Sequence, residues 1–136
     1  MSGGEVFFDT NVVLYLLSAD AAKADRAEDL LASGGTISVQ VLNEFAAVAR
    51  RKIRMSWPEI RETLTPIRAV CAVEPLSTAT HDQATKISER YGLSVYDSLI
   101  VAAALLAGCK TLYSEDMQDG QIIERKLTIR NPFTVG

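Results

Sequence analysis

The chain has 136 residues, of which 48% are hydrophobic and 23% are charged, and its formal net charge at pH 7 is −3. These values predict one soluble globular domain spanning residues 1–136, with enough apolar residues for a substantial core. The longest apolar run, at 99–107, is too short to cross a membrane, and the N-terminus lacks the pattern of a signal peptide, so we expect a cytoplasmic protein without a membrane partner.

The first half of the chain alternates between short apolar runs and helical patterns. Residues 6–8 are predicted to form a strand, after which Asp9 to Asn11 provide capping residues for a helix from 12 to about 18. The further elements predicted here are a helix over 24–32 ended by two glycines, a strand over 36–38, a helix capped by Ser38 that runs to about 53, and a helix that opens with a capping box at Ser56 and fades near Pro66.

The second half repeats this alternation. The predicted elements are a strand over 69–73, a helix capped by Thr78 or Thr80 that stops at Gly92, an apolar helix over 94–107, a strand over 111–113, a polar turn over 114–120, a short helix over 121–124 and a final strand over 127–129. The order predicts an α/β fold with a mostly parallel central sheet flanked by helices. In such folds, functional residues gather beyond the carboxyl ends of the strands.

Four carboxylates stand at the boundaries of these elements: Asp9, Glu44, Asp97 and Asp116. Asp9 and Asp116 follow strands, and Asp97 lies in the first turn of the most apolar helix. Glu44 lies at the border of the apolar face of its helix. If the four converge, each pair at ~5 Å repels by roughly 3 kcal/mol at an effective dielectric constant near 20. A cluster of this kind needs cations to stay ionised.

Each of these acids also has a purely structural interpretation. Asp9 fits a helix cap or an Asx turn, and Asp116 and Asp119 fit turn residues. Asp97 matches a capping box that starts at Ser94, and Glu44 fits an ordinary residue on the flank of a helix. Capping and metal binding are compatible, because a carboxylate has two oxygens. The joint placement on four separate elements favours the metal site.

The residue types indicate which metal the site would bind. Carboxylate oxygens with no His or Cys nearby select Mg²⁺ or Mn²⁺, as one or two ions, rather than zinc. Such ions activate a water and neutralise negative charge that develops during a reaction. Asn11 or Thr10 is placed to position the acids. The two cysteines, Cys71 and Cys109, are predicted to be buried free thiols.

The negative net charge argues against a nucleic-acid partner, but its distribution does not. Removing the five candidate site acids from the total of −3 leaves +2 for the rest of the chain. Basic residues cluster at 50–54, where they fit either a solvated helix end or a phosphate-contacting patch. Trp57 fits a surface for stacking a base, or packing in the core or a dimer.

Four segments, taken in order, resemble the motifs of the PIN-domain nucleases: residues 6–14, 38–45, 91–104 and 112–120. Chain length, motif order and the ending Asn131-Pro132-Phe133 are similar to VapC-type toxins of bacterial toxin–antitoxin pairs. The resemblance covers essentially the whole chain and implies a PIN-like three-layer sandwich. It also implies a metal-dependent endoribonuclease that cleaves RNA, with a small cognate antitoxin as partner and a homodimer in solution.

By the same resemblance, the catalytic and metal-binding quartet is Asp9, Glu44, Asp97 and Asp116, supported by Asn11 and Ser114, and Asp119 is a further candidate ligand. Ser114 departs from the threonine that is frequent in the fourth motif but keeps the hydroxyl. Three other functions are weighed: a housekeeping RNA-processing PIN nuclease, a non-catalytic acidic module that binds a basic partner segment, and a haloacid-dehalogenase-type phosphatase. The phosphatase requires a second aspartate where this chain has Asn11.

Overall fold

The computed structural model describes residues 5–133, which contain a six-stranded sheet. Its strands are β1 (Val6–Phe8), β2 (Gly35–Ser38), β3 (Cys71–Glu74), β4 (Thr111–Tyr113), β5 (Ile122–Ile123) and β6 (Leu127–Arg130), in the order β3-β2-β1-β4-β6-β5. Neighbouring strands are parallel except for the β5–β6 pair, which is antiparallel. The predicted α/β fold with a mostly parallel sheet is confirmed.

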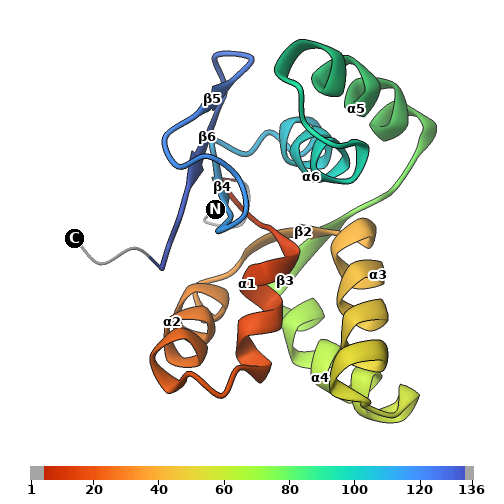
Figure 1. The fold of residues 1–136 in the computed structure, drawn as a ribbon, viewed down its shortest axis with the longest axis vertical. Coiled ribbons are helices and arrows are strands. Elements are labelled where there is room, and N and C mark those ends of the chain that lie inside the picture. Colours follow the sequence, from red (N-terminus) through yellow and green to blue (C-terminus); the bar gives the residue numbers. More distant parts are fainter. Residues whose placement is uncertain (1–4, 134–136) are drawn as a thin grey trace.

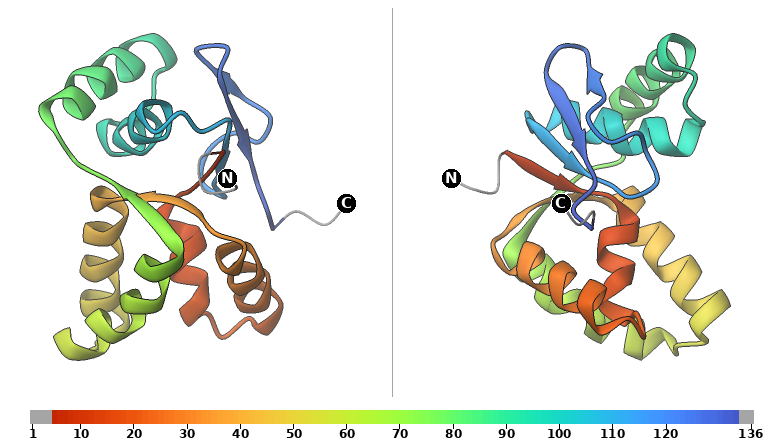
Figure 2. Two further views of the ribbon diagram at one scale, coloured as in Figure 1. Left: turned by 180° about the vertical axis from the view of Figure 1, so that it is seen from behind. Right: turned by 60° about the vertical axis from the view of Figure 1, so that its left-hand side comes forward.

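The helices cover both faces of the sheet. They are α1 (Thr10–Leu14), the 3₁₀-helix η2 (Tyr15–Leu17), α2 (Ala21–Ala32), α3 (Val39–Val48), the π-helix η3 (Ala49–Ile53), α4 (Trp57–Val70), α5 (Thr78–Tyr91) and α6 (Val95–Leu106). Figure 1 shows α5 and α6 on one side of the sheet and α1 to α4 on the other. Figure 2 shows the same three layers from two other directions. None of the helices within residues 5–133 has the length and apolar character needed to cross a bilayer.

The order of the strands determines where a site can form. From β1 the chain moves outward to β2 and β3, and it then returns to the opposite side of β1 with β4. The connections therefore diverge between β1 and β4, and we call the region beyond the carboxyl ends of these two strands, where such sheets bind ligands, the crevice. Asp9 directly follows β1 and Ser114 directly follows β4.

The core lies on both sides of the central strands. Phe7, Phe8 and Leu112 are almost fully buried between the helical layers. Gly35 in β2 allows the Phe8 ring to approach closely, since a Cβ atom at position 35 would lie 2.5 Å from Cε2 of Phe8. Cys71 and Cys109 are buried and free, as predicted, and burial raises the pKa of the Cys71 thiol to about 11.

Two predicted helix boundaries in the first half are wrong. Helix α2 begins at Ala21 rather than 24, because the Asp20 side chain accepts hydrogen bonds from the Ala22 and Lys23 amides. Helix α4 does not fade at Pro66 but continues to Val70, so residues 69 and 70 are helical and not part of a strand. Pro66 lies on the exposed side of this helix, where water can satisfy the carbonyl that lost its donor.

Two further predictions fail in the second half. The cap of α5 is Ser77, which forms a reciprocal capping box with Thr80, and neither Thr78 nor Thr80 is the cap. No helix forms over 121–124. These residues contain strand β5 and the start of the turn that joins β5 to β6 in a β-hairpin. Its turn contains two residues with left-handed backbone, Glu124 (φ 53°) and Arg125 (φ 58°). The Glu124 carboxylate accepts hydrogen bonds from Arg90 and Tyr91 of α5, which hold this turn in place.

Candidate functional site

Asp9 and Ser114 leave the sheet side by side. Phe8 and Tyr113 are partners in the parallel β1–β4 pair, and the Asp9 amide donates to the Tyr113 carbonyl at 2.9 Å. Asp9 caps α1 by accepting a hydrogen bond of 2.7 Å from the Thr10 amide, and its other oxygen accepts one of 2.7 Å from the Ser114 hydroxyl. The capping interpretation of Asp9 is therefore correct, and it leaves this carboxylate 4% exposed at the crevice.

Burial is the main reason why the pKa of Asp9 is raised, from 3.8 to about 7. The hydrogen bonds from Ser114 and Thr10 lower this pKa, and the negative charges of Asp116 and Asp97 raise it. Asp9 therefore lies close enough to both acids for their charges to interact. A group with this pKa is partly protonated near neutral pH and would release its proton when a cation binds beside it.

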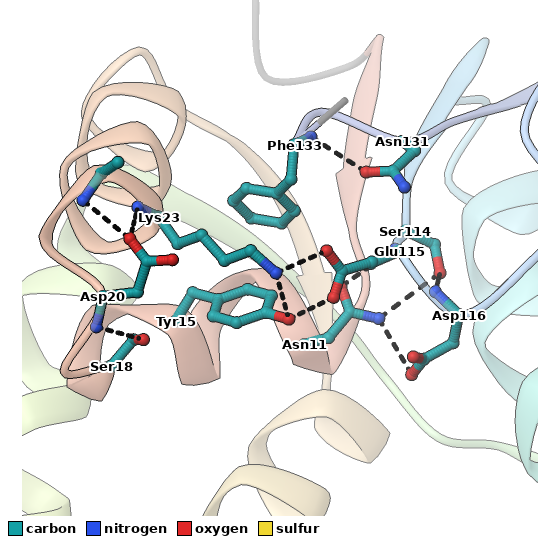
Figure 3. Close-up of polar contacts among 11 residues, drawn as sticks. Asn11, Tyr15, Ser18, Asp20, Lys23, Ser114, Glu115, Asp116, Asn131 and Phe133 are labelled. Carbon is teal, nitrogen blue, oxygen red and sulfur yellow. Dashed lines mark hydrogen bonds and ion pairs between the residues drawn. The ribbon is translucent and has the colours of Figure 1, made fainter. Parts of the chain in front are cut away.

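The side chain of Asn11 connects Asp9 with Asp116. Its Nδ2 lies 3.3 Å from Oδ2 of Asp9 and 3.1 Å from Oδ2 of Asp116, and its Oδ1 accepts a hydrogen bond of 3.2 Å from the Glu115 amide. Figure 3 shows Asn11 directed at the loop after β4. Ser114 shapes the same loop, because its hydroxyl oxygen accepts from the Asp116 amide at 3.2 Å. Both predicted supporting residues thus contact predicted site acids.

Glu44 reaches this crevice from α3. That helix starts at its cap Ser38, at the end of the strand next to β1, and Phe45 and Val41 fix it to the core. Oε1 of Glu44 accepts a hydrogen bond of 2.6 Å from the Thr10 hydroxyl, and Oε2 accepts one of 3.1 Å from the side-chain amide of Gln40. Glu44 is half-buried at the border of the apolar face, as the helical pattern predicts, and its carboxylate is directed at α1.

Asp97 reaches the crevice from the start of α6. The cap of this helix is Ser94, whose hydroxyl oxygen accepts from the Asp97 amide at 3.1 Å. Within residues 5–133 the reciprocal bond from the Ser94 amide to the Asp97 carboxylate is not formed, in contrast to the complete box at Ser56 and Glu59. Burial, followed by the charges of Asp116 and Glu44, raises the pKa of Asp97.

The four predicted quartet acids thus form one electrostatic cluster, since Asp9 interacts with Asp97 and Asp116, and Asp97 interacts with Asp116 and Glu44. In the described residues, no three Asp, Glu, His or Cys side chains already form a metal-binding arrangement. Neutral donors of the chain instead bind carboxylate oxygens of Asp9, Glu44 and Asp116. The donor set fits a hard cation: it contains carboxylate, amide and hydroxyl oxygens, and repulsion among the acids is relieved by positive charge.

Asp119, the fifth candidate ligand, has a different contact. One of its oxygens accepts a hydrogen bond of 2.9 Å from the Asn131 amide, which ties the loop after β4 to the end of β6. This contact matches the turn role that the sequence allows. Its assignment as a metal ligand stays a prediction.

Tyr15 and Lys23 contact Glu115 in the loop after β4 and support this loop. These contacts were not predicted from the sequence. The Tyr15 hydroxyl donates to Glu115, and Nζ of Lys23 lies 3.0 Å from the same carboxylate and 4.6 Å from the centre of the Tyr15 ring. Phe133 packs edge-on against that ring, as Figure 3 shows. Tyr15 and then Lys23 lower the pKa of Glu115. Glu115 lies between Ser114 and Asp116, so these contacts fix the segment that carries two predicted site residues.

The comparisons with known proteins agree with this geometry. The family model described as "PIN domain" matches residues 6–118. No curated protein sequence matches significantly. Among solved structures, a toxin–antitoxin complex from Klebsiella pneumoniae is similar with a TM-score of 0.72 and 19% identity, covering 96% of this chain and 100% of that one.

Two further structures share the fold. VapC20 of Mycobacterium tuberculosis, a toxin that cleaves the sarcin–ricin loop, has a TM-score of 0.67 and 23% identity, covering 82% of this chain and 90% of its own. VapBC2 of Rickettsia felis, bound to a DNA fragment from its promoter, has a TM-score of 0.58 and 19% identity, covering 82% and 87%. At these identities the similarity shows the fold.

Proposed function

This chain belongs to the PIN-domain family, and on that premise we propose that it is a metal-dependent endoribonuclease that acts as the toxin of a VapBC-type toxin–antitoxin pair. The observation that carries the proposal is the single cluster of Asp9, Glu44, Asp97 and Asp116 where the connections that follow the paired strands β1 and β4 diverge. The toxin role is supported by the similar structures, which include a toxin that cleaves the sarcin–ricin loop and two toxin–antitoxin assemblies.

The residues that would hold Mg²⁺ or Mn²⁺ are these four acids. One or two ions bound among them would activate a water and neutralise charge on the scissile phosphodiester. Ser114 and the Thr10 amide hold the two oxygens of Asp9 in fixed directions. The amide of Asn11 keeps the Asp116 carboxylate beside Asp9.

Glu44 and Asp97 add acids from two other helices, α3 and α6. The Glu44 carboxylate is oriented by Thr10, a residue of the same helix that Asp9 caps, so α1 aligns acids from two different elements. Asp97 projects from the first turn of α6, where the positive end of the helix dipole favours negative charge on the acid or on a substrate phosphate. Asn11 and Thr10 would not bind the ion themselves but would orient the carboxylates that bind it.

The acidic cluster also fits the binding of an antitoxin. A small antitoxin that inserts an arginine or lysine into the crevice would form charge-assisted pairs with these acids and compete with the cation. We propose this partner, an RNA substrate and a homodimer in solution. Co-expression of the neighbouring reading frame should relieve growth arrest caused by this chain, and light scattering of the purified chain should give the mass of a dimer.

The first experiment measures cleavage of total RNA by the purified chain in Mn²⁺. We expect cleavage that EDTA stops and that Asp97→Asn abolishes, because asparagine lacks the charge that a hard cation requires. Asp82→Asn, at an exposed position of α5, is the matched control and should cleave like wild type. Circular dichroism should show that Asp97→Asn is folded, since Ser94 provides the cap of α6.

The same experiment addresses the second candidate function. A non-catalytic acidic module is favoured by the fact that the chain's own donors already occupy Asp9 and Glu44. Metal-dependent binding of RNA or of a basic peptide, without cleavage under any condition, would support that module and contradict the nuclease. Cleavage that Asp97→Asn retains would point to a contaminating enzyme.

A further inference from the structure

The chain turns between α3 and α4 at a strongly basic point. Helix α3 passes into the π-helix η3, which ends at Arg54 in the left-handed conformation (φ 61°), and the Met55 amide closes the turn on the Ala49 carbonyl at 3.1 Å. Figures 1 and 2 show this turn, in yellow, at the outer edge of the molecule. We define the basic tip as Arg50, Arg51, Lys52, Arg54 and Trp57.

The charges of the basic tip are not neutralised within the protein. All four cations are exposed, and in residues 5–133 none of them forms an ion pair with a carboxylate. Four of the 14 basic residues of the chain thus occur within five positions of a protein whose net charge is −3. Four uncompensated cations at one point attract a polyanion by releasing its counterions.

An aromatic ring accompanies these charges. Trp57 is 51% exposed at the first position of α4, and the Arg50 guanidinium lies 5.2 Å from the centre of its ring. Arg50 also donates to the Met55 carbonyl at 3.1 Å, so this stacked pair has a defined position. An exposed indole beside cations is the combination by which proteins stack unpaired bases while binding their phosphates.

The basic tip lies in line with the acidic cluster. Arg51 follows Glu44 by seven residues along the continuous helix formed by α3 and η3, so the basic tip lies about 10 Å further along this helix than Glu44. A nucleic-acid strand whose scissile phosphate lies at the acids can therefore follow α3 to the basic tip. The side chains of Arg51 and Lys52 would meet phosphates outside the crevice.

We propose that the basic tip binds an unpaired stretch of the RNA substrate, with Arg51 and Lys52 on its phosphates and Trp57 stacked on a base. The RNA class of the ligand rests on the proposed function, whereas the binding surface itself rests on the charges and the ring. A single strand is favoured over a duplex, because only unpaired bases expose a face to an aromatic side chain. The basic tip would thus select cleavage sites in loops.

The test measures binding of a fluorescent oligouridylate to the full chain in EDTA, so that no cleavage occurs, at several salt concentrations. Arg51→Gln combined with Lys52→Gln should weaken binding and reduce the slope of log K against log salt by about 1.4, which corresponds to two phosphates on a single strand. Trp57→Leu should weaken binding about tenfold with little change in slope. Lys86→Gln with Lys126→Gln removes the same charge elsewhere on the surface and should change neither quantity.

Three outcomes overturn the proposal. The first is that the variants of the basic tip keep the wild-type affinity and the wild-type salt slope. The second is that Lys86→Gln with Lys126→Gln loses as much affinity and slope as the variants of the basic tip do. The third is competition by polyglutamate as strong as that by RNA, which would assign the surface to an acidic protein partner. Cleavage of RNA in Mn²⁺ is measured in parallel. If the chain cleaves RNA but the variants of the basic tip bind it as wild type does, the proposal for the basic tip is refuted and the nuclease is not. If binding depends on the basic tip but no RNA is cleaved, the nuclease is refuted and the basic tip is not.

Discussion

The side-chain amide of Asn11 donates a hydrogen bond of 3.1 Å to the carboxylate of Asp116, which lies 105 positions further along the chain. Asn11 thereby joins the first helix to the loop after β4. Asn11→Ala removes this bond and leaves the Glu115 amide without its acceptor. We expect cleavage to fall by about 10–100-fold, as for other residues that orient metal ligands.

The loss of Asn11 should also destabilise the fold by about 1–2 kcal/mol, because a partly buried amide loses its partner. Denaturant unfolding and initial cleavage rates measure the two effects. Asn43→Ala, at an exposed position of α3, is the matched control. Wild-type cleavage by Asn11→Ala would show that Asp116 is positioned without Asn11.

The raised pKa of Asp9 predicts how stability depends on pH in the absence of metal. Because the pKa rises from 3.8 to about 7 on folding, the folded chain binds more protons than the unfolded chain between these values. The free energy of unfolding should therefore fall as pH rises from about 4 to 7, by about 4 kcal/mol at 1.4 kcal/mol per pKa unit. The raised pKa of Asp97 acts in the same direction.

Asp9→Asn tests this sign, because asparagine can still accept the bond from the Thr10 amide. Denaturant unfolding in EDTA across this pH range should show a much smaller slope and a more stable protein above pH 7 than wild type. Asp82→Asn is again the matched control. A wild-type slope in Asp9→Asn would mean that another group titrates.

Metal binding should stabilise the chain more at higher pH. A cation at the cluster competes with the proton on Asp9, so the rise in Tm caused by Mn²⁺ should be larger at about pH 8 than at about pH 6. Thermal unfolding with and without Mn²⁺ measures this difference. Asp97→Asn should lose most of the rise, and Asp119→Asn tests whether Asp119 contributes. A rise that is equal in all variants would indicate a cation bound elsewhere.

The hairpin between β5 and β6 offers a test of backbone strain far from the acids. Arg125 is held at φ 58°, a conformation that costs a residue with a Cβ atom about 1–2 kcal/mol. Arg125→Gly should therefore stabilise the protein by about 1 kcal/mol, after the greater chain entropy of glycine is subtracted, and raise Tm by about 3 °C.

Lys126→Gly, one position further, is the control because Lys126 is not in the left-handed region. It should destabilise the protein by about 1 kcal/mol. Equal effects of the two glycines on Tm would show that the turn is not strained.

The features that the sequence predicted well are those determined by a local signal. The β1 strand, the caps Ser38, Ser56 and Ser94, and the stop at Gly92 each depend on a few adjacent residues, and the structure has them as predicted. The sheet type followed from the alternation of elements. Asp9 and Asp116 lie in the segments after β1 and β4, and Asp97 lies in the first turn of α6, as the sequence predicted, whereas Glu44 lies within α3 and was placed by the apolar face of that helix.

The failures come from interactions between distant residues. The turn of the last hairpin is stabilised by Arg90 and Tyr91 of α5, so no local pattern at 121–124 shows a strand. Helix α4 passes Pro66 because buried Ile67 holds its last turn against the core. The group formed by Tyr15, Lys23 and Glu115 joins residues 92 and 100 positions apart, and no motif marks it.

The central place of β1 has a consequence for synthesis on the ribosome. Strand β1 is translated well before β4, so one flank of β1 stays open until β4 is made, and only then does Asp9 acquire Ser114 and Asp116 as neighbours. Strand β4 in turn pairs with β6, the last strand described. A growing chain therefore carries separated carboxylates, and the cluster forms only after β4 and the loop with Asp116 have left the exit tunnel.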